Sequence, residues 1–566
     1  MSERLGIRVA VASAYYRVAI LAMTALAALV PLSVMLYQSF LNAPLTVAGA
    51  QFGLDAYRIV FGDEDFAVAV GTTLLLSSCM TLIAVPLGSV LAFLMVRTDL
   101  PARAWLEPVI LIPVVVSTLV LAFGYVFAIG PSGILTTWFK AGTGLQAWNL
   151  HSLSIIVVIA GLLHVPYVYV YAATELRGLD SAHEEVARAS GARPWKVALD
   201  VSLPMATPAI FFAGVLVFFL GFELFGLPLV LGSPDGVLVL TTYLFKLPGK
   251  AMLPPYQLMA VVAAIMVAIA MPLVLMLRIL LREPQRYVWS HSNAKPAAPL
   301  KLGHWRWPAF VAVALWLGAA VLVPLGGLIL RSFAGTDGEG VALWKSLGLG
   351  HYRDLLQHAD IVRSVVNTLE IGLIGGAAAV TFYAAVALAI RRWRSRWTRA
   401  VDVLITVARA MPGLVAGLAI LLTLLFFKPI ASLRHTLISV WLGYAVVWLA
   451  TGMRLVSTAL LKFSPELQDA ARSMGASSAR VHLDVTLPLL RTGILASWLV
   501  ILLIFVREYA TAVFLLGPGT EVVGSLLVSL WGAGATDLVA ALAVINVGMI
   551  GLGLLVAGGL GVRLHG

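Results

Sequence analysis

Two short patterns in the chain contain residue types that hydrolytic enzymes use, but neither pattern is complete. The segment H-E-E-V-A at 183–187 begins like the zinc-binding pattern H-E-x-x-H, yet Ala187 stands where the second histidine ligand is required. The segment G-P-S-G at 130–133 has the form found around an intramembrane serine nucleophile, and His164 follows in a later apolar stretch. A nucleophilic serine needs its base within about 3 Å, whereas Ser132 lies in a Gly/Pro turn followed by polar residues. We therefore expect a turn at Ser132, a packed or hydrogen-bonded His164, and no catalytic residue.

Charged side chains inside long apolar stretches form a second group. Glu223 lies in one such stretch, Arg507 and Glu508 in another, and Arg409 in a third. An ionisable residue at the middle of a membrane span costs about 2.5–3.5 kcal/mol on insertion scales, so it usually faces a helix bundle interior or a wet cavity. The one cysteine, Cys79, leaves no disulfide and no thiolate cluster, and we predict no metal site.

The elements that must position these residues are transmembrane helices. Of the 566 residues, 61% are hydrophobic and 11% charged, and the mean hydropathy is +0.97, whereas soluble proteins carry about 25% charged residues. A chain this long and this apolar has too little polar surface to cover it in water. The composition therefore excludes a soluble enzyme, a disordered chain and a nucleic-acid-binding domain, and no nucleic-acid partner is expected.

Twelve apolar stretches are long enough to cross a membrane as helices, since a span needs about 20 residues. They form two sets of six, in residues 1–282 and 306–566, separated by a polar linker at 283–305 that we expect to be cytoplasmic. The predicted spans are 17–40, 68–95, 105–129, 153–174, 206–232 and 256–282, followed by 308–332, 366–391, 400–427, 436–457, 491–517 and 536–562. With the N-terminus inside, the cytoplasmic segments hold 26 Lys and Arg and the opposite loops 10. This bias predicts that both termini are cytoplasmic.

A polar loop occurs twice, once in each half. Residues 184–210 align without gaps with residues 468–494, at an offset of 284, and 11 of the 27 positions are identical. The identities include Arg, Gly, Asp and Pro, so they do not reflect shared Leu and Val content. Each copy has an acidic helical start, a glycine suited to a sharp turn between two short helices, and a Leu-Pro pair suited to the start of the next helix. The duplication predicts a two-fold docking surface for a symmetric partner.

The repeated loop resembles the EAA loop of permeases in ATP-binding-cassette (ABC) importers. That motif reads Glu-Ala-Ala, three residues, Gly, nine residues and Ile-x-Leu-Pro, and the copies at 181–204 and 465–488 keep this spacing at every step. Val186 replaces the first Ala, Asp469 replaces Glu, and Val replaces Ile in both copies. The resemblance implies an all-α integral membrane protein made of two tandem six-helix units of the type I importer permease fold, with 12 transmembrane helices related by a pseudo-two-fold axis.

In this family the short helix of the loop inserts into a groove of an ATPase subunit. The resemblance places ATPase coupling on Glu185, Ala187, Gly191, Leu203 and Pro204 in the first copy, and on Asp469, Ala471, Gly475, Leu487 and Pro488 in the second. No G-x-x-x-x-G-K-[ST] phosphate loop occurs in the chain. The family therefore implies no cofactor in this chain, and a separate homodimeric ATPase that binds ATP and Mg²⁺. It also implies an extracytoplasmic solute-binding protein and a place in the bacterial cytoplasmic (inner) membrane.

Two observations bear on the substrate. Fusion of two six-helix units, together with the segments at 222–228 and 507–515, is similar to the ferric-iron permeases, which implies ferric iron or a ferric complex as the solute. Permeases for thiamine, polyamines and phosphonate or phosphorylated solutes are close relatives and stay open as alternatives. A secondary transporter also has two six-helix halves, but it has no need of a duplicated loop for an ATPase.

The repeat also relates the charged residues inside the membrane. Carried into the fifth and eleventh spans, the offset of 284 aligns Glu223 with Arg507 and places Tyr509 opposite Phe225. We expect Glu223, Arg507, Glu508 and Tyr509 to line the translocation path towards its outer mouth. We also expect Glu223 to pair with Arg507 across the pseudo-two-fold axis when the permease faces inward.

Overall fold

The structure, a computed structural model, consists of helices, and the residues that it describes contain no β-strand. It describes residues 2–145, 148–179, 182–250, 253–280, 299–334, 347–392, 396–461, 470–477, 480–481, 484 and 487–560. Most of the predicted linker at 283–305 lies outside these residues. The backbone of its last part, at Leu300, is hydrogen-bonded to Arg97 and Asp99 at the end of the second span.

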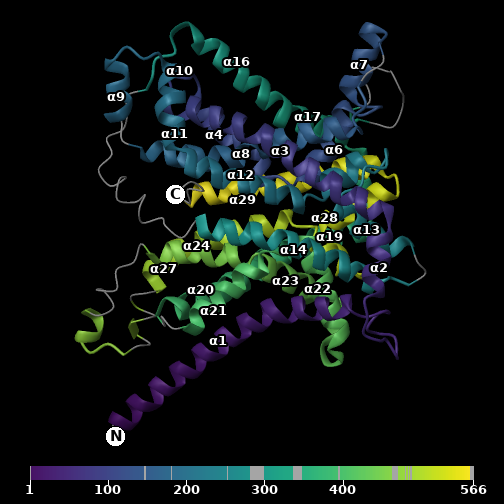
Figure 1. Cartoon of the computed structure of the whole chain (residues 1–566), viewed down its shortest axis with the longest axis vertical. Helices are drawn as coiled ribbons and strands as arrows, with labels where there is room; N and C mark the ends of the chain where they lie inside the picture. The colour runs from purple at the N-terminus through teal and green to yellow at the C-terminus, as the bar shows by residue number, and fades with distance from the viewer. Residues whose placement is uncertain are drawn as a thin grey trace.

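The helices fall into two similar series (Figure 1). The first series contains α1 (Ser2–Ser39), α2 (Asp55–Gly62), α3 (Glu64–Arg97), α4 (Arg103–Ile110), α5 (Ile112–Val115), α6 (Thr118–Ile129), α7 (Ile134–Thr143), α8 (Leu153–Gly178), α9 (Ala182–Ala189), α10 (Pro194–Val197), α11 (Leu203–Met205), α12 (Thr207–Glu223), α13 (Leu240–Lys246) and α14 (Tyr256–Leu280). The second contains α16 (Arg306–Leu317), α17 (Val323–Phe333), α18 (Gly350–Gln357), α19 (Ala359–Glu370), α20 (Gly376–Arg392), α21 (Arg396–Ala408), α22 (Gly413–Phe426), α23 (Leu437–Val447), α24 (Leu449–Leu461), α27 (Leu487–Arg507), α28 (Val523–Gly532) and α29 (Thr536–Gly559).

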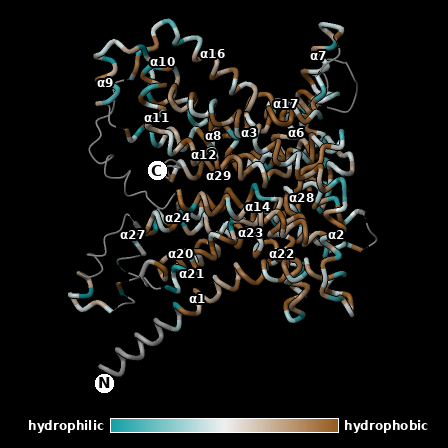
Figure 2. The backbone as a smooth tube through the Cα atoms, viewed as in Figure 1, coloured by the Kyte–Doolittle hydropathy of each residue, from teal (hydrophilic) through white to brown (hydrophobic). Residues whose placement is uncertain are grey.

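The long helices pass side by side through one apolar layer. Figure 2 shows hydrophobic residues along the middle of these helices and hydrophilic residues at α9 and α10, near one end of the bundle. Backbone amides and carbonyls inside a membrane must bond within the protein, and a helix satisfies nearly all of them internally. The predicted all-α integral membrane fold is confirmed.

Nine helices in the described part of the chain are long and apolar enough to span a membrane, and four further pairs pass the same test with a bend between their members. The nine, with three of the bent pairs, account for the twelve predicted spans. The ninth span, predicted at 400–427, is bent by 110° between α21 and α22. The third, predicted at 105–129, is divided into α4, α5 and α6. The fifth and eleventh end earlier than predicted, at Glu223 and Arg507.

The fourth bent pair was not predicted as a separate element. It consists of 228–235 and 240–249, which meet at 76°, and α28 is its counterpart in the second half. The backbone N–H of Leu240, the first residue of α13, donates to Thr73 Oγ1, and that of Val523, the first residue of α28, donates to Thr368 Oγ1, each at 2.9 Å. Each half thus carries a short apolar helix anchored in the same way to a long one.

The first long helices of the two halves are exchanged. α1 packs against α14 of its own half but also along α20, α21 and α22 of the other half. In the matching arrangement, α17 packs against α29 and along α6. Gly124 and Gly327 let α6 and α17 approach closely, since a Cβ on Gly327 would lie 2.6 Å from that of Ala128. The two six-helix units are therefore intertwined around the pseudo-two-fold axis.

Candidate functional site

The first repeated loop contains the sharp turn that its glycine predicts. α9 ends at Ala189, and Gly191 two residues later has a φ of +81°. The backbone N–H of Ala192 donates to the carbonyl of Ala187 at 3.0 Å, and that of Gly191 donates to the carbonyl of Arg188 at 2.9 Å. This pair of bonds is the Schellman arrangement that ends a helix. A left-handed φ costs little only for glycine, which has no Cβ.

The second repeated loop makes the same turn at the same positions. Gly475 has a φ of +85°, Ala476 N–H donates to Ala471 O at 3.0 Å, and Gly475 N–H donates to Arg472 O at 2.9 Å. Asp469 lies outside the described residues. The repetition of both bonds at an offset of 284 shows that the duplicated sequence encodes a duplicated local structure.

The Leu-Pro pairs do not act identically in the two copies. Leu487 and Pro488 begin α27, as predicted. Leu203 and Pro204 instead lie in a helical run that continues from 195 to 205 through a π-helical segment, and the 72° bend comes after it, at Ala206. Proline at the first helical turn lacks only an N–H that would be free there anyway, which suits Pro488 at the start of α27.

The first loop presents apolar side chains to solvent. Val186, Trp195 and Leu199 are 68%, 56% and 58% exposed, and Glu185 beside them is also exposed. In the second copy Met474 is 89% exposed. Exposed apolar residues next to a charged rim are typical of a surface that another protein covers.

A buried ion pair fixes the first loop to the membrane helices, and the sequence reasoning did not find it. Glu184 lies 3.1 Å from Arg97 at the end of α3, and both side chains are under 5% exposed. Ser202 Oγ donates to the same carboxylate at 2.8 Å. Glu184 therefore anchors α9, while its neighbour Glu185 is free to contact a partner. The adjacent acidic residues gave no sign of this division, because only the fold places Arg97 beside one of them.

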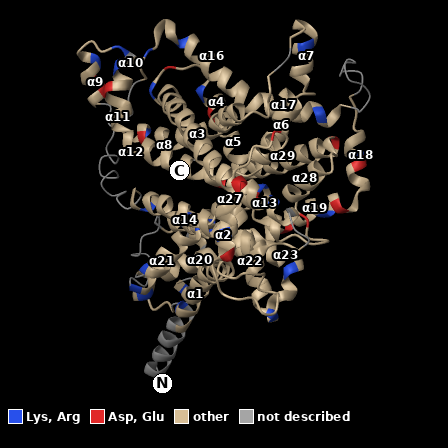
Figure 3. Ribbon diagram, turned by 45° about the vertical axis from the view of Figure 1, so that its right-hand side comes forward, with Lys and Arg blue, Asp and Glu red and all other residues tan. Residues whose placement is uncertain are grey.

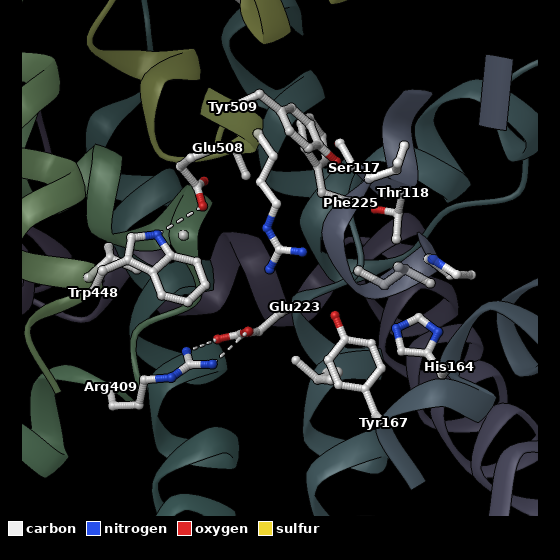
Figure 4. Close-up of a pocket in the computed structure, with 18 residues that line it drawn as sticks. Ser117, Thr118, His164, Tyr167, Glu223, Phe225, Arg409, Trp448, Glu508 and Tyr509 are labelled. Carbon is white, nitrogen blue, oxygen red and sulfur yellow. Dashed lines mark hydrogen bonds and ion pairs between the residues drawn. The ribbon is translucent and has the colours of Figure 1, made fainter. Parts of the chain in front are cut away.

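The charged residues inside the membrane surround one cavity of about 150 Å³ between the two halves (Figure 4). All four residues predicted to line the translocation path are among its walls. Its polar lining consists of Ser117, Thr118, His164, Tyr167, Glu223, Arg409, Trp448, Arg507, Glu508 and Tyr509.

Glu223 pairs with Arg409 rather than with Arg507. Arg409 Nη1 lies 2.7 Å from Glu223 Oε1, and the guanidinium also lies over the rings of Phe219 and Trp448, 5.1 and 5.8 Å from their centroids. No ion pair between Glu223 and Arg507 occurs among the described residues. In the conformation of this structure, Arg409 takes the place expected for Arg507 in the inward-facing state, because the bend between α21 and α22 turns Arg409 into the cavity.

Arg507 makes the contact that corresponds to this ion pair in the other half. Its Nη1 donates to the carbonyl of Val114. α12 ends at Glu223 and α27 at Arg507, and Val114 and Arg409 each lie four residues before the helix that follows the break. The end of the fifth span in each half therefore contacts the broken third span of the opposite half. Arg409 was the missed residue, and its place inside a predicted span was the available signal.

Glu508 is held by its own half. Trp448 Nε1 donates to Oε2 at 3.1 Å, and the backbone N–H and the hydroxyl of Thr511 donate to Oε1 at 3.2 and 3.1 Å. Tyr444 donates to the Glu508 carbonyl at 2.7 Å. These bonds close the turn after α27 and orient the next residue, Tyr509.

Phe225 and Tyr509 meet on the pseudo-two-fold axis. Their rings stack with centroids 5.9 Å apart at 19°, and they are the residues that the offset of 284 aligns. Equivalent residues contact each other only close to the axis that relates them. The cavity therefore lies beside this axis.

Within the described residues, Ser132 and His164 of the incomplete serine pattern do not form a hydrogen-bonded pair. Ser132 is exposed in a turn between α6 and α7, and His164 Nδ1 lies 2.7 Å from the carbonyl of Ala160, with its ring stacked on Tyr167 at 5.5 Å. Both interpretations made from the sequence are confirmed.

Comparisons with known proteins give one consistent result. The chain is 25% identical over 462 residues to the probable ABC transporter permease protein y4fN of Sinorhizobium fredii, covering 79% of each chain. It is 25% identical over 250 residues to the putrescine transport system permease protein PotI of Escherichia coli (42% of this chain, 86% of PotI) and 30% identical over 154 residues to the molybdenum transport system permease protein ModB of the same organism (26% and 65%). The family model for the binding-protein-dependent transport system inner membrane component matches residues 84–286 and 379–564. Because these matches cover most of both intertwined halves, the chain belongs to this family of transport permeases, with one copy of the family domain in each half.

Proposed function

We propose that this chain is the permease of an ABC importer and that its two halves together form the translocation path. In this proposal a homodimeric ATPase, with its ATP and Mg²⁺, docks on the two repeated loops, and an extracytoplasmic binding protein delivers the solute to the opposite side. The observation that carries the proposal is the repeated loop itself, whose glycine turn has the same hydrogen bonds at Gly191 and Gly475. Two identical turns related by a pseudo-two-fold axis suit a partner that is itself a symmetric dimer.

The orientation in the proposal places both loops and both termini in the cytoplasm of a bacterium. Figure 1 supports this, because the beginning of α1, the end of α29 and α9 lie on the same side of the molecule. Figure 3 shows basic residues at α10 and α21 and residues of both signs at α9, whereas acidic residues are visible at α18 and α19. Basic residues collect on the cytoplasmic side of inner-membrane proteins. In this orientation, we propose that residues 1–282 and 306–566 form the two six-helix permease units.

For the solute we propose ferric iron or a ferric complex, on the similarity of the fused units and of segments 222–228 and 507–515 to ferric-iron permeases. Two of the relatives are named for putrescine and molybdenum. Thiamine, polyamines and phosphonate or phosphorylated solutes remain the alternatives. A secondary transporter remains the alternative from another class.

Co-purification tests the coupling part of the proposal. The full chain, tagged and co-expressed with the ABC ATPase encoded beside it, should retain two ATPase copies in mild detergent. Replacing the exposed Leu199 by Glu should release the ATPase, whereas the same change at Leu356, which is 76% exposed on α18 outside the predicted spans, should not. A wild-type chain that transports its solute without any ATPase would refute the proposal and favour a secondary transporter. Uptake of radiolabelled ferric iron, compared with putrescine and 2-aminoethylphosphonate, tests the solute.

A further inference from the structure

The acidic groups of the cavity are already bonded to protein donors. The two carboxylate oxygens of Glu223 accept from Arg409 at 2.7 and 3.5 Å. Those of Glu508 accept from Trp448 and from Thr511. A solute that enters this cavity therefore meets carboxylate oxygens that already accept hydrogen bonds from the protein, and Arg409 also neutralises the charge of Glu223.

Arg507 is in the opposite situation. A guanidinium has five N–H donors and cannot be deprotonated in a protein. Within the described part of the chain, the hydrogen-bond acceptor of Arg507 is the carbonyl of Val114, and its guanidinium has no carboxylate at ion-pair distance. This cation lines the cavity with donors to spare, and a guanidinium bonds most strongly to anionic oxygens.

Two helix N-termini reinforce this positive charge. α6, of 12 residues, and α22, of 14 residues, begin at Thr118 and Gly413, and both of these residues line the cavity. A helix N-terminus carries about half a positive charge, and in α6 the Ser117 hydroxyl, a cavity wall group, caps the N–H of Leu119. Broken membrane helices that begin at a cavity stabilise anionic groups there in this way.

A further cation lies between the cavity and the second repeated loop. Arg454 follows Trp448, a wall residue, by six positions, which is about 9 Å along α24. It lies within electrostatic range of Tyr171, Arg409, Asp402 and Arg278, and Asp402 is itself bonded to Arg278 at 2.6 Å. Arg454 itself has no ion pair among the described residues and is exposed.

We propose that the cavity is a binding site for an anionic group of the transported solute, a carboxylate, phosphonate or phosphate, with Arg507 as its anchor and Arg454 as the next cation on the way inward. The proposal rests on the proposed function, which puts this cavity on the translocation path. It narrows the solute class. A polyamine, which carries only positive charge, does not fit beside Arg507, and ferric iron passes as a complex whose ligands present anionic oxygens.

The test measures binding to the purified full chain in lipid nanodiscs by isothermal titration calorimetry. The probes are citrate, ferric citrate, inorganic phosphate, 2-aminoethylphosphonate and putrescine, so that the carboxylate and phosphorus anions are distinguished. We expect at least one anion to bind and putrescine not to bind. Arg507→Gln should weaken anion binding at least tenfold. Arg507→Lys, which keeps the charge, should bind at least threefold more tightly than Arg507→Gln.

The matched control is Arg363→Gln, because Arg363 pairs with Glu521 away from the cavity, and it should bind the anion as the wild type does. Binding of putrescine in place of the anions, equal anion affinity of Arg507→Gln and wild type, or no binding of any probe would overturn the proposal. The measurement needs no ATPase. If the anion site fails while the ATPase still co-purifies, only the solute class is wrong, and the proposed function stands.

Discussion

Replacing either partner of the Glu223–Arg409 ion pair should destabilise the folded chain by about 3 kcal/mol. The two charged atoms lie 2.7 Å apart, and the side chains are 16% and 20% exposed. Removing one partner of a buried pair costs about 3–5 kcal/mol, because the other charge stays buried without it. Because water in the cavity partly reaches both side chains, we expect Glu223→Gln and Arg409→Gln to cost free energy at the lower end of this range.

The double variant Glu223→Gln/Arg409→Gln, compared with the two single variants, measures the interaction free energy between the two side chains. Two unit charges 4 Å apart attract each other by about 4 kcal/mol at an effective dielectric constant of ~20, and water in the cavity reduces this value. We expect a coupling free energy of about 2 kcal/mol, so the double variant should be more stable than the sum of the single effects predicts. The assay is equilibrium unfolding of the purified chain in mixed detergent micelles.

Double-mutant cycles of two other residue pairs serve as controls. The pair Arg363–Glu521 has side chains 44% and 23% exposed, and an exposed pair couples by less than about 1 kcal/mol. The pair Glu223–Arg507 should show almost no coupling. A coupling below about 0.5 kcal/mol for Glu223–Arg409, or equal coupling of Glu223 to both arginines, would refute the assignment of the partner.

Three more substitutions test other features of the structure. Gly191→Val and Gly475→Val should each cost about 1–2 kcal/mol locally, because their φ angles of +81° and +85° disfavour a side chain; membrane insertion should persist while ATPase co-purification falls. Gly226→Ala should cost about 1–3 kcal/mol in unfolding assays, since the new Cβ would collide with the Tyr509 hydroxyl beside the axis. Arg97→Gln should cost about 3–5 kcal/mol and release the ATPase, since it leaves a buried carboxylate unpaired.

Control variants accompany Gly226→Ala and Arg97→Gln, and one result would contradict the prediction for the loop glycines. Gly249→Ala adds a Cβ where the space is open, so it should leave stability unchanged; an equal effect at Gly226 would refute the collision. Glu185→Gln alters an exposed carboxylate and should leave the unfolding free energy unchanged, unlike Arg97→Gln. Normal uptake with both loop glycines replaced by valine would contradict the coupling role of the turns.

Apolar length was sufficient to predict the spans, but not where they break. Pro86, Pro166 and Pro272 lie within uninterrupted helices, whereas Pro412 caps the helix that follows a 110° bend. Every proline lacks the backbone N–H, but only a proline inside a helix thereby removes an i→i−4 hydrogen bond. Neighbouring helices decide whether the freed backbone groups find other hydrogen-bond partners. Which helices become neighbours cannot be read from the apolar pattern of the sequence, so the positions of the breaks were not predicted.

The lack of information about neighbouring helices also explains which site residues were predicted and which were missed. Glu223 and Tyr509 were expected on one path, and both do line one cavity. The partner of Glu223 was not found, because the offset of 284 holds only from the loops onward. In the third span the helices after the break begin at Thr118 and Gly413, an offset of 295. An alignment made on the loops therefore could not place Arg409.

The exchanged first helices have a consequence for biosynthesis. α1 ends at Ser39, but its partner α22 ends at Phe426, so 387 residues separate their completion. At about 5–20 residues per second, α1 waits roughly 20–80 s in the bilayer with lipid in place of its neighbours from the second half. During this interval the first half is a membrane-inserted intermediate rather than a finished domain. A nascent chain stalled before residue 400 should therefore expose α1 to lipid-phase crosslinkers and proteases, and release from the stall should protect it.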